Sequence, residues 1–485
     1  MKVAFTYPPL ESEKGTPLLS QNRQFQWFTK PTYIFPVVPA TAATMVRDAG
    51  HEVLWLDGIA SQLTERKFLQ KLQNFEPDII WLETKTPVVK AHWKWIDVLK
   101  KHFPETKVVL CGDHVTAFPR ESFENSKIDC ILTGGDYDFL LINLLNYITD
   151  SANTKLEPGI WLLEDGDIIN TGKFVLDHEL SEAPWIDRDL VNWELYAYKN
   201  GNFRSIPGTY IMSARDCWHH KCTFCSWTTL YPSYRFRDPI EVVDEIGNLI
   251  EKYNIKEIMD DSGTLPIGKW LKTFCEEMIK RGYNKKITLN CNMRFGCLTS
   301  DDYKLMAKAG FRFVLFGLES ANQKTLDRLV KGINQEEIIN GAKEARAAGL
   351  DVHVTVMFGY PWETAEDMKA TVKMARELLI KGYAFTLQVT MVTPYPGTPL
   401  YDEVKEAGWL ITENWDNFDM RMNVMPGESS EQEVKKAIRS VYSAIFHPMA
   451  LINRLVKTKH PIDDAKFYAR GLTQVIGHLA DFKNK

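Results

Sequence analysis

Short apolar runs alternate with amphipathic stretches along the first third of the chain. The runs read as strands because they are brief and end in small or polar residues, and the stretches between them repeat apolar positions at helical spacing. The predicted strands are 2–6, 51–57, 77–83, 107–114 and 129–136, and the predicted helices are 39–50, 61–75 and 90–103. This alternation predicts an α/β domain with a doubly wound, Rossmann-like sheet, which binds ligands beyond the carboxyl ends of its strands.

The same alternation resumes after residue 206, beginning with an apolar run at 209–212. The predicted strands that follow are 255–259, 286–290, 311–316, 351–357 and 384–390, and the predicted helices are 240–253, 268–281, 301–309, 335–348 and 366–381. About six strand–helix units result, with polar residues where the strands end. The pattern predicts a partial (β/α)6 barrel of the TIM type.

Changes in this pattern divide the chain into four parts. We expect a Rossmann-like domain over 1–145, an interdomain strap over 146–205, the barrel over 206–400 and a helical C-terminal region over 401–485. The strap is rich in loop signals and long for a linker. The helices predicted for the last part, a C-terminal cap, are 401–407, 430–445, 448–457 and 463–480.

The composition is that of a soluble globular protein. The chain has 485 residues, of which 45% are hydrophobic and 25% charged, and its formal net charge of −5 gives no reason to expect nucleic acid as a partner. No apolar run is long enough to span a bilayer, and the opening strand breaks at Pro8-Pro9 too early for a secretory signal. Eight cysteines in a chain of this length predict no disulfide framework, so we expect a cytoplasmic protein.

Three of the cysteines, Cys217, Cys222 and Cys225, lie within nine residues. Thiolates this close in sequence form a site for a soft metal. Three protein ligands would leave one iron of a [4Fe–4S] cluster open to bind another molecule, whereas a structural zinc site needs four ligands. The alternative interpretation is therefore a zinc site completed by His219, His220 or a distant cysteine.

This segment resembles the signature Cys-x-x-x-Cys-x-aromatic-Cys of the radical S-adenosylmethionine (SAM) enzymes. Cys222-Thr223-Phe224-Cys225 matches its second half, and four residues separate Cys217 from Cys222 where the family usually has three. The resemblance implies a [4Fe–4S] cluster held by the three cysteines, with SAM bound at the open iron. Reductive cleavage of SAM would then give a 5′-deoxyadenosyl radical that abstracts hydrogen from an unactivated carbon.

Further motifs follow in the family's order. Asp260-Asp261 suits the ammonium of SAM, Arg294 suits its carboxylate, and Gly359-Tyr360-Pro361 resembles the turn near adenine, where glycine admits close approach. The resemblance implies SAM contacts at Phe224, Asp260, Asp261, Arg294, Glu319, Ser320, Gly359, Tyr360 and Pro361. It assigns no catalytic residue.

The N-terminal domain resembles the cobalamin-binding domain that precedes the barrel in one subgroup of this family. The match lies in a strand ending Pro-Pro, a Gly-x-His loop and a Thr-Gly-Gly loop. It implies cobalamin contacts at Pro8, Pro9, Glu83, Thr84, Thr86, Gly112, Asp113, His114, Gly134 and Gly135. The alternative is an empty flavodoxin-like module used for packing.

We expect the cobalt to lack a histidine ligand from the protein. Cobalamin domains that ligate cobalt use Asp-x-His-x-x-Gly, whereas this chain has Asp57-Gly58-Ile59. His114 is interpreted as a pocket-lining or hydrogen-bonding residue, with cobalt ligation as the alternative.

Two segments carry the resemblance further, Cys222-Thr223-Phe224-Cys225-Ser226-Trp227 and Arg235-x-Arg237-Asp238-Pro239. They resemble the group of radical SAM enzymes that includes magnesium-protoporphyrin monomethyl ester cyclase and hopanoid-biosynthesis enzymes. The resemblance implies a cobalamin-dependent radical SAM enzyme, with methyl transfer from methylcobalamin to carbon as the leading hypothesis. The alternatives are radical cyclisation or ring rearrangement with the same cofactors, and a non-enzymatic metal- or cobalamin-binding protein.

The expected partners are a small molecule and an external electron donor of the flavodoxin or ferredoxin type. Aromatic residues at the expected barrel mouth favour an apolar or ring-bearing substrate. These residues are Trp227, Tyr231, Tyr234, Tyr360, Trp362 and Tyr395. The basic amphipathic stretch 450–460 indicates peripheral membrane contact as an alternative to a solvated helix face.

Overall fold

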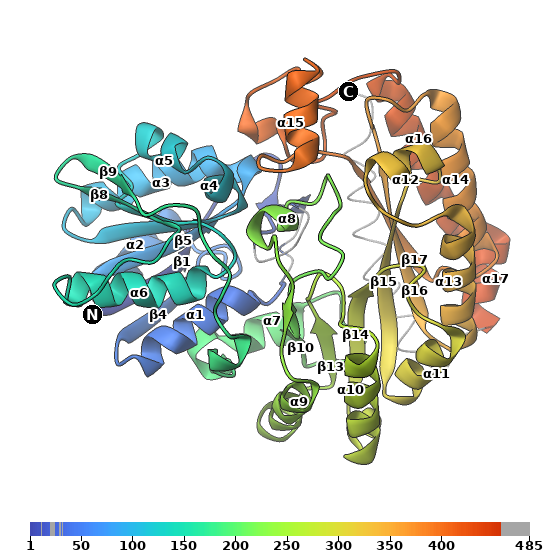
Figure 1. Ribbon diagram of the computed structural model, residues 1–485, viewed down its shortest axis with the longest axis horizontal. Helices are drawn as coiled ribbons and strands as arrows, with labels where there is room; N and C mark the ends of the chain where they lie inside the picture. Colours follow the sequence, from blue (N-terminus) through green and yellow to red (C-terminus); the bar gives the residue numbers. More distant parts are fainter. Residues whose placement is uncertain (11, 20–24, 29–30, 32, 457–485) are drawn as a thin grey trace.

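The computed structural model describes residues 1–456 except 11, 20–24, 29, 30 and 32. Two α/β lobes lie side by side, each built around its own sheet (Figure 1). The predicted fold class is confirmed, because a Rossmann-like lobe, a partial barrel and a helical C-terminal part follow one another along the chain.

Within the described residues, the N-terminal sheet has seven strands in the order β4-β1-β5-β6-β7-β8-β9. Their bounds are β1 (Lys2–Tyr7), β4 (Glu52–Asp57), β5 (Ile79–Thr84), β6 (Lys107–Gly112), β7 (Cys130–Leu132), β8 (Ile160–Glu164) and β9 (Asp167–Asn170). The first five strands in this order are parallel, so their carboxyl ends meet at one edge. A small separate hairpin pairs β2 (Thr16–Pro17) with β3 (Trp27–Phe28).

Helices cover both faces of this sheet, because its strands are apolar on both sides. One face is covered by α1 and α6 and the other by α2 and α3, where Phe68, Leu72 and Ile96 are fully buried. The helices of this lobe are α1 (Val37–Asp48), α2 (Glu65–Phe75), α3 (Val89–His102), α4 (Asp113–Ala117), α5 (Pro119–Asn125) and α6 (Tyr137–Thr149). The sheet is therefore doubly wound.

The expected strap, 146–205, does more than connect the lobes. Its β8 and β9 form a hairpin that pairs antiparallel with β7 and extends the N-terminal sheet. Ile160 and Leu162 are buried while Leu163 is 42% exposed, as expected for a strand near a sheet edge. α7 (Trp193–Lys199) then leads to the barrel. Two short strands among loop signals give no indication of their partner, so the sequence does not predict this pairing.

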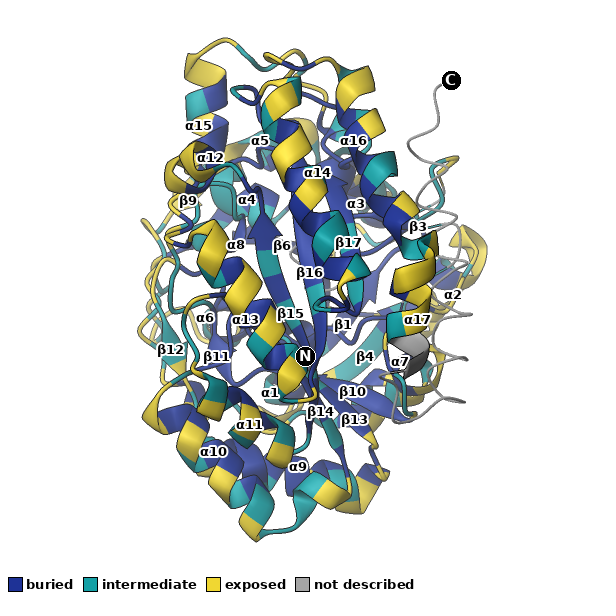
Figure 2. Cartoon of the chain, turned by 90° about the vertical axis from the view of Figure 1, so that its right-hand side faces the viewer, coloured by how far each residue is buried: buried dark blue, intermediate teal, exposed yellow. Residues whose placement is uncertain are grey.

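The six described strands of the barrel sheet are all parallel, in the order β10-β13-β14-β15-β16-β17. They are β10 (Gly208–Ile211), β13 (Glu257–Asp260), β14 (Thr288–Met293), β15 (Phe311–Glu319), β16 (Asp351–Phe358) and β17 (Thr386–Met391). This arrangement confirms the predicted partial barrel. The strands are buried, whereas the outer helices carry exposed stripes (Figure 2).

Local sequence signals explain where the barrel helices begin. Thr299, Asn334 and Thr364 each form a capping box with the acidic residue three positions later. The helices are α9 (Pro239–Tyr253), α10 (Lys269–Lys280), α11 (Ser300–Lys308), α12 (Gln323–Arg328), α13 (Gln335–Ala347) and α14 (Ala365–Ile380). Except for α12, which precedes α13 in the same connection, each returns the chain to the amino-terminal end of the next strand.

The described C-terminal part contains α15 (Pro399–Glu406), α16 (Glu431–Ser443) and α17 (Pro448–Val456). α16 packs against α14 and β17, while α15 lies between the lobes at the top of Figure 1. The helix predicted over 463–480 lies outside the described residues. None of the helices that the structure describes has the length and apolar character needed to cross a membrane.

Candidate functional site

The clustered cysteines lie in a loop whose two ends are paired. This cysteine loop, residues 216–226, follows β11 (Ala214–Arg215), and after α8 (Trp227–Leu230) the chain returns through β12 (Arg235–Phe236). β11 and β12 form an antiparallel ribbon in which Arg215 stands opposite Arg235. The loop begins shortly after β10 ends, at the carboxyl edge of the barrel sheet.

The three thiols are partly exposed and form no disulfide within the described chain. Cys217 Sγ lies 2.9 Å from Thr264 Oγ1. Burial raises the pKa of Cys222, and the positive charge of Lys331 opposes that shift. Among the described residues, no three His, Cys, Asp or Glu side chains converge as ligands of a single metal ion, the arrangement that a mononuclear zinc site needs. Ligands to separate irons of one cluster need not converge in this way.

Three consecutive backbone carbonyls form the turn 329–331, of which the first two hold the cysteine loop and the third holds Arg294 beside it. They accept hydrogen bonds from the Thr223 amide at 3.1 Å, from His219 Nε2 at 2.7 Å and from the guanidinium of Arg294. His220, between the first two cysteines, has a positive φ of 33°. The additional residue of this segment is therefore absorbed in a tight turn that neighbouring backbone supports.

Several predicted SAM contacts gather beside this loop. Glu319, the last residue of β15, lies 2.8 Å from Lys331 Nζ in a buried ion pair. Lys331 Nζ also lies 5.8 Å from the centre of the Phe224 ring. Arg294 stacks over the indole of Trp218 at 5.0 Å. Charged and aromatic groups thus surround the loop on its barrel side.

Other predicted SAM contacts are engaged by the protein itself. Ser320 Oγ donates to Glu363 Oε1 at 2.7 Å, and Asp260 Oδ1 accepts from the Ser262 amide at 3.0 Å. Asp261 directly follows β13. The structure therefore gives Asp260 and Ser320 roles in fixing the strand ends.

The Gly359-Tyr360-Pro361 turn follows β16, and Gly359 has a φ of 95°, a conformation that favours glycine. The Pro361 carbonyl accepts from the Glu428 amide at 3.0 Å, so the C-terminal part supports the turn. The Tyr360 hydroxyl is buried and has no hydrogen-bond partner in the described part of the chain. It is thus available to a ligand at the mouth of the barrel.

A buried acid lies at the carboxyl edge of the N-terminal sheet. Glu83, near the end of β5, accepts hydrogen bonds from the Tyr7 hydroxyl at 2.6 Å and from the Tyr137 hydroxyl at 3.4 Å. Burial raises the pKa of Glu83 to about 7. A Cβ added to Gly112 would strike the Thr84 carbonyl, so glycine is required where β5 and β6 end side by side.

His114 uses both ring nitrogens within the protein. Nδ1 lies 3.3 Å from Thr86 Oγ1, and Nε2 lies 3.1 Å from Glu121 Oε2. Burial raises the pKa of the adjacent Asp113. The aromatic rings around His114 are those of Trp93, Phe118 and Trp415. This setting favours a hydrogen-bonding role for His114 over cobalt ligation.

The remaining residues implied in cobalamin binding have close protein neighbours. A Cβ added to Gly134 would strike the ring of Phe174, and one added to Gly135 would strike the ring of Tyr231. Pro8-Pro9 follow β1 and are buried. Packing within the chain is thus a sufficient reason for glycine at 134 and 135.

A cleft of about 990 Å³ lies between the two lobes. Aromatic side chains line it, together with basic and acidic ones: Phe118, Trp161, Phe174, Tyr401, Trp415, Arg120, Lys173, Lys405, Glu121, Glu124 and Glu413. Thr228, on the wall formed by α8, donates its hydroxyl to the Cys225 carbonyl at 2.7 Å. The cleft therefore borders the cysteine loop.

The residues around the cysteine loop suit an iron–sulfur cluster and a ligand bound beside it. Three thiols in one loop, with the positive charges of Lys331 and Arg294 close by, form a donor set for an anionic iron–sulfur cluster. The hydroxyls of Tyr234 and Tyr360 are buried and, counting described residues only, without partners. They provide polar groups for a ligand beside the cluster.

Sequence reasoning missed the residues that hold these contacts in place. Lys331, Tyr7 and Tyr137 carry no motif signal. The Glu83 partner of the two tyrosines is distant in sequence, and Lys331 lies 12 residues from Glu319. Asp136 directly follows the Thr-Gly-Gly loop, and Arg235 belongs to a segment already noted for its resemblance. These last two could have been found from the sequence.

Comparison with known proteins identifies both lobes. Residues 33–139 match the B12 binding domain, and residues 212–375 match the radical SAM superfamily. An uncharacterised methyltransferase of Pyrococcus horikoshii is 27% identical to this chain, over 93% of the chain and 94% of that protein. The anaerobic magnesium-protoporphyrin IX monomethyl ester cyclase of Cereibacter sphaeroides is 28% identical over 73% of the chain. The matched region covers 57% of that protein.

The fold agrees with a solved structure. The cobalamin-dependent S-adenosylmethionine radical enzyme OxsB, with aqua-cobalamin and S-adenosylmethionine bound, matches with a TM-score of 0.72 at 16% identity. The match covers 98% of this chain and 71% of that one, and at this identity it concerns the fold. The chain therefore joins a B12-binding domain to a radical SAM domain, and these two domains imply a [4Fe–4S] cluster, S-adenosylmethionine and cobalamin as its cofactors.

Proposed function

We propose that the protein is a cobalamin-dependent radical SAM C-methyltransferase. When bound, the cofactors supply the reductive cleavage of SAM and a cobalt centre that can carry a methyl group. The protein's part is to position these groups, to exclude water and to present an unactivated carbon of the substrate.

One junction between the lobes carries this proposal. The Gly135 amide donates to the Leu230 carbonyl at 3.0 Å, and the Tyr231 hydroxyl donates to the Gly135 carbonyl at 3.1 Å. Gly135 belongs to a loop implied in cobalamin binding, and Leu230 ends α8, the helix that follows the cysteine loop. The two implied cofactor sites adjoin, as a transfer that involves both cofactors requires.

Similarity along almost the whole chain supports methyl transfer. The chain matches the Pyrococcus methyltransferase nearly from end to end, and it also matches 57% of the Cereibacter cyclase. The second candidate is radical cyclisation or ring rearrangement with the same cofactors, which the similarity to that cyclase supports.

The interlobe cleft supports an apolar, ring-bearing substrate. Phe118, Phe174 and Trp415 are among the aromatic side chains on its walls, and such surfaces bind planar rings by stacking. Arg120 and Lys173 lie in the same lining and are suited to orient polar substituents.

The remaining partners belong to the same proposal. A flavodoxin- or ferredoxin-type donor would reduce the cluster, and a cytoplasmic location would supply it. Peripheral membrane contact through α17 is supported by Met449, Leu451 and Ile452, which are 48%, 44% and 48% exposed.

Product analysis under anaerobic conditions tests the function. Protein loaded with the cluster and hydroxocobalamin is reduced and given SAM that carries a deuterated methyl group. We expect both S-adenosylhomocysteine and 5′-deoxyadenosine, and we expect the former to disappear when cobalamin is omitted. 5′-Deoxyadenosine without S-adenosylhomocysteine would favour cyclisation or rearrangement. Intact SAM would favour a non-enzymatic binding protein.

A further inference from the structure

Asp136 connects the N-terminal lobe to the base of the cysteine loop. It follows Gly134-Gly135 at the end of β7, and its side chain is 1% exposed. Its Oδ1 and Oδ2 accept hydrogen bonds from both terminal nitrogens of Arg235, each at 2.7 Å. Oδ1 also accepts from Arg215 Nη1 at 3.1 Å. One carboxylate therefore binds two guanidinium groups of the other lobe.

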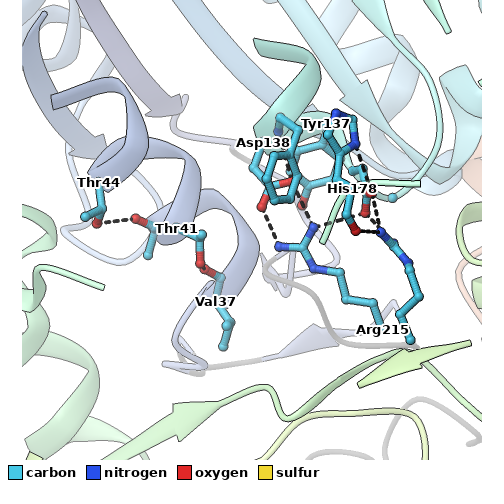
Figure 3. A network of polar contacts seen from close by, with 12 residues as sticks. Val37, Thr41, Thr44, Tyr137, Asp138, His178 and Arg215 are labelled. Atoms are coloured by element: carbon cyan, nitrogen blue, oxygen red, sulfur yellow. Dashed lines mark hydrogen bonds and ion pairs between the residues drawn. The ribbon is translucent and has the colours of Figure 1, made fainter. Parts of the chain in front are cut away.

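The two arginines are the opposed pair of the β11–β12 ribbon, which closes the cysteine loop. Arg215 also donates from both terminal nitrogens to Asp138, at 2.9 Å for Nη1 to Oδ1 and at a shorter separation for the second contact. Figure 3 shows Arg215 and Asp138 facing each other beside Tyr137 and His178. The ribbon is thus fixed to the start of α6 at two carboxylates.

The strap completes the network through His178. Its Nε2 lies 3.1 Å from Glu157 Oε2, and its Nδ1 lies 3.4 Å from Asp136 Oδ2. The ring stacks on Phe139 with 4.4 Å between the ring centres. The His178 carbonyl accepts from Arg235 Nη1 at 2.8 Å. Hydrogen bonds to Asp136 and Glu157 raise the pKa of His178 to about 10, so three cationic groups from the strap and the barrel face three carboxylates.

A buried network of ion pairs tolerates little displacement of its members. Movement of one member is therefore passed on to the others. Removing one member of a buried ion-pair network leaves an uncompensated charge, which is strongly destabilising. Fork-to-fork guanidinium–carboxylate contacts are also specific in geometry. A shift of the loop after β7 must consequently move the β11–β12 ribbon, or break these bonds.

We propose that Asp136 is a positioning residue that couples occupancy of the cobalamin site to occupancy of the cluster site. The loop that leads into Asp136 contains two of the implied cobalamin contacts, and the ribbon that Asp136 holds carries the cluster ligands on its connecting loop. Binding that orders either loop orders the other. The coupling is reciprocal, since each cofactor must change the affinity of the other by the same factor.

Titration of hydroxocobalamin under anaerobic conditions tests this coupling. The full-length protein is titrated with its cluster reconstituted and again after the cluster has been removed, and binding is followed by absorbance. We expect wild-type protein to bind about tenfold more tightly when the cluster is present, and Asp136→Asn to reduce this ratio to about one. A second readout is the EPR spectrum of the cluster under excess reductant, which also converts hydroxocobalamin to a reduced cobalamin. Bound cobalamin should alter the cluster signal in wild-type protein and leave it unchanged in Asp136→Asn.

Glu257→Gln is the matched control. Glu257 is a fully buried carboxylate that accepts from Arg312 Nη2 at 2.6 Å, but it lies at the amino-terminal end of β13, away from the cofactor edge. Glu257→Gln should lower overall stability. It should leave the ratio of hydroxocobalamin affinities, with and without the cluster, at its wild-type value. Arg235→Lys is the milder test if Asp136→Asn does not fold, because Arg235 is 18% exposed and its charge is retained. A wild-type ratio of one, or a ratio in the Asp136 and Arg235 variants equal to that of Glu257→Gln, would overturn the proposal.

Discussion

The ammonium of Lys331 lies 2.8 Å from the carboxylate of Glu319, and both side chains are more than nine-tenths buried. Lys331 belongs to the turn that holds the cysteine loop, and Glu319 ends β15. Burial disfavours the charge of Lys331, but the neighbouring Glu319 carboxylate outweighs that effect and raises the lysine pKa above its ordinary value. One ion pair thus fixes the turn that supports the cysteine loop to the end of β15.

Replacing Lys331 with methionine should lower the free energy of unfolding by about 3 kcal/mol, because the Glu319 carboxylate is left buried without its partner. Denaturant-induced unfolding of the cofactor-free protein measures the loss. The double variant Lys331→Met/Glu319→Gln removes both charges and should recover most of it. Equal stability of wild-type protein and the single variant would contradict the importance of this pair.

Loss of any one cysteine of the loop should abolish assembly of the cluster. We expect Cys222→Ala to retain little iron after anaerobic reconstitution, whereas wild-type protein should hold about four irons per chain. Cys297→Ala is the control, since Cys297 is also only partly buried but lies outside the loop. Iron and sulfide analysis distinguishes the variants, and full iron content in Cys222→Ala would exclude that residue as a ligand.

Glu83 should make stability depend on pH. Its pKa rises from 4.5 to about 7 on folding, so the folded state favours the protonated form. The resulting stabilisation is complete below the unfolded pKa and is lost as the pH rises through about 7. The glutamine in Glu83→Gln stays neutral at every pH. The free energy of unfolding of this variant, relative to that of wild-type protein, should therefore rise by up to about 3 kcal/mol between pH 5 and pH 8.5.

Urea unfolding of both proteins at the two pH values measures the effect of Glu83→Gln. The exposed residue Glu105 supplies the control, because Glu105→Gln should shift stability equally at both pH values. A pH-independent difference between Glu83→Gln and wild-type protein would show that Glu83 titrates normally.

Alanine at Gly135 should disturb the junction between the lobes. The added Cβ would strike the Tyr231 ring, and overpacking of this kind typically costs about 2 kcal/mol. We expect a lower thermal midpoint and weaker hydroxocobalamin binding. The double variant Gly135→Ala/Tyr231→Leu should recover part of the stability, and a fully stable Gly135→Ala would show that the junction adapts without strain.

Local periodicity is enough to predict both sheets. The apolar run 351–357, for example, becomes β16 (Asp351–Phe358), because a short run between helical stretches has few other ways to be buried. Local periodicity does not predict pairings between distant segments. Arg215 and Arg235 lie 79 and 99 residues from Asp136 in sequence, and nothing local in the three residues specifies their contact.

The residues of the candidate site fall into the same two groups, those that local sequence identifies and those that it does not. Spacing and residue type identify the cysteines and the glycine turn at 359. Lys331 and Tyr7 cannot be identified in this way, because the role of a lone lysine or tyrosine depends on the group that it contacts in the folded protein. The sequence thus identifies the ligands of the cofactors more readily than the groups that hold those ligands in place.

The β11–β12 ribbon also bears on the cost of presenting the sulfur donors. Because Arg215 stands opposite Arg235, the ends of the segment that carries the three cysteines are joined to each other. The entropy of closing that segment is therefore part of the cost of folding the polypeptide.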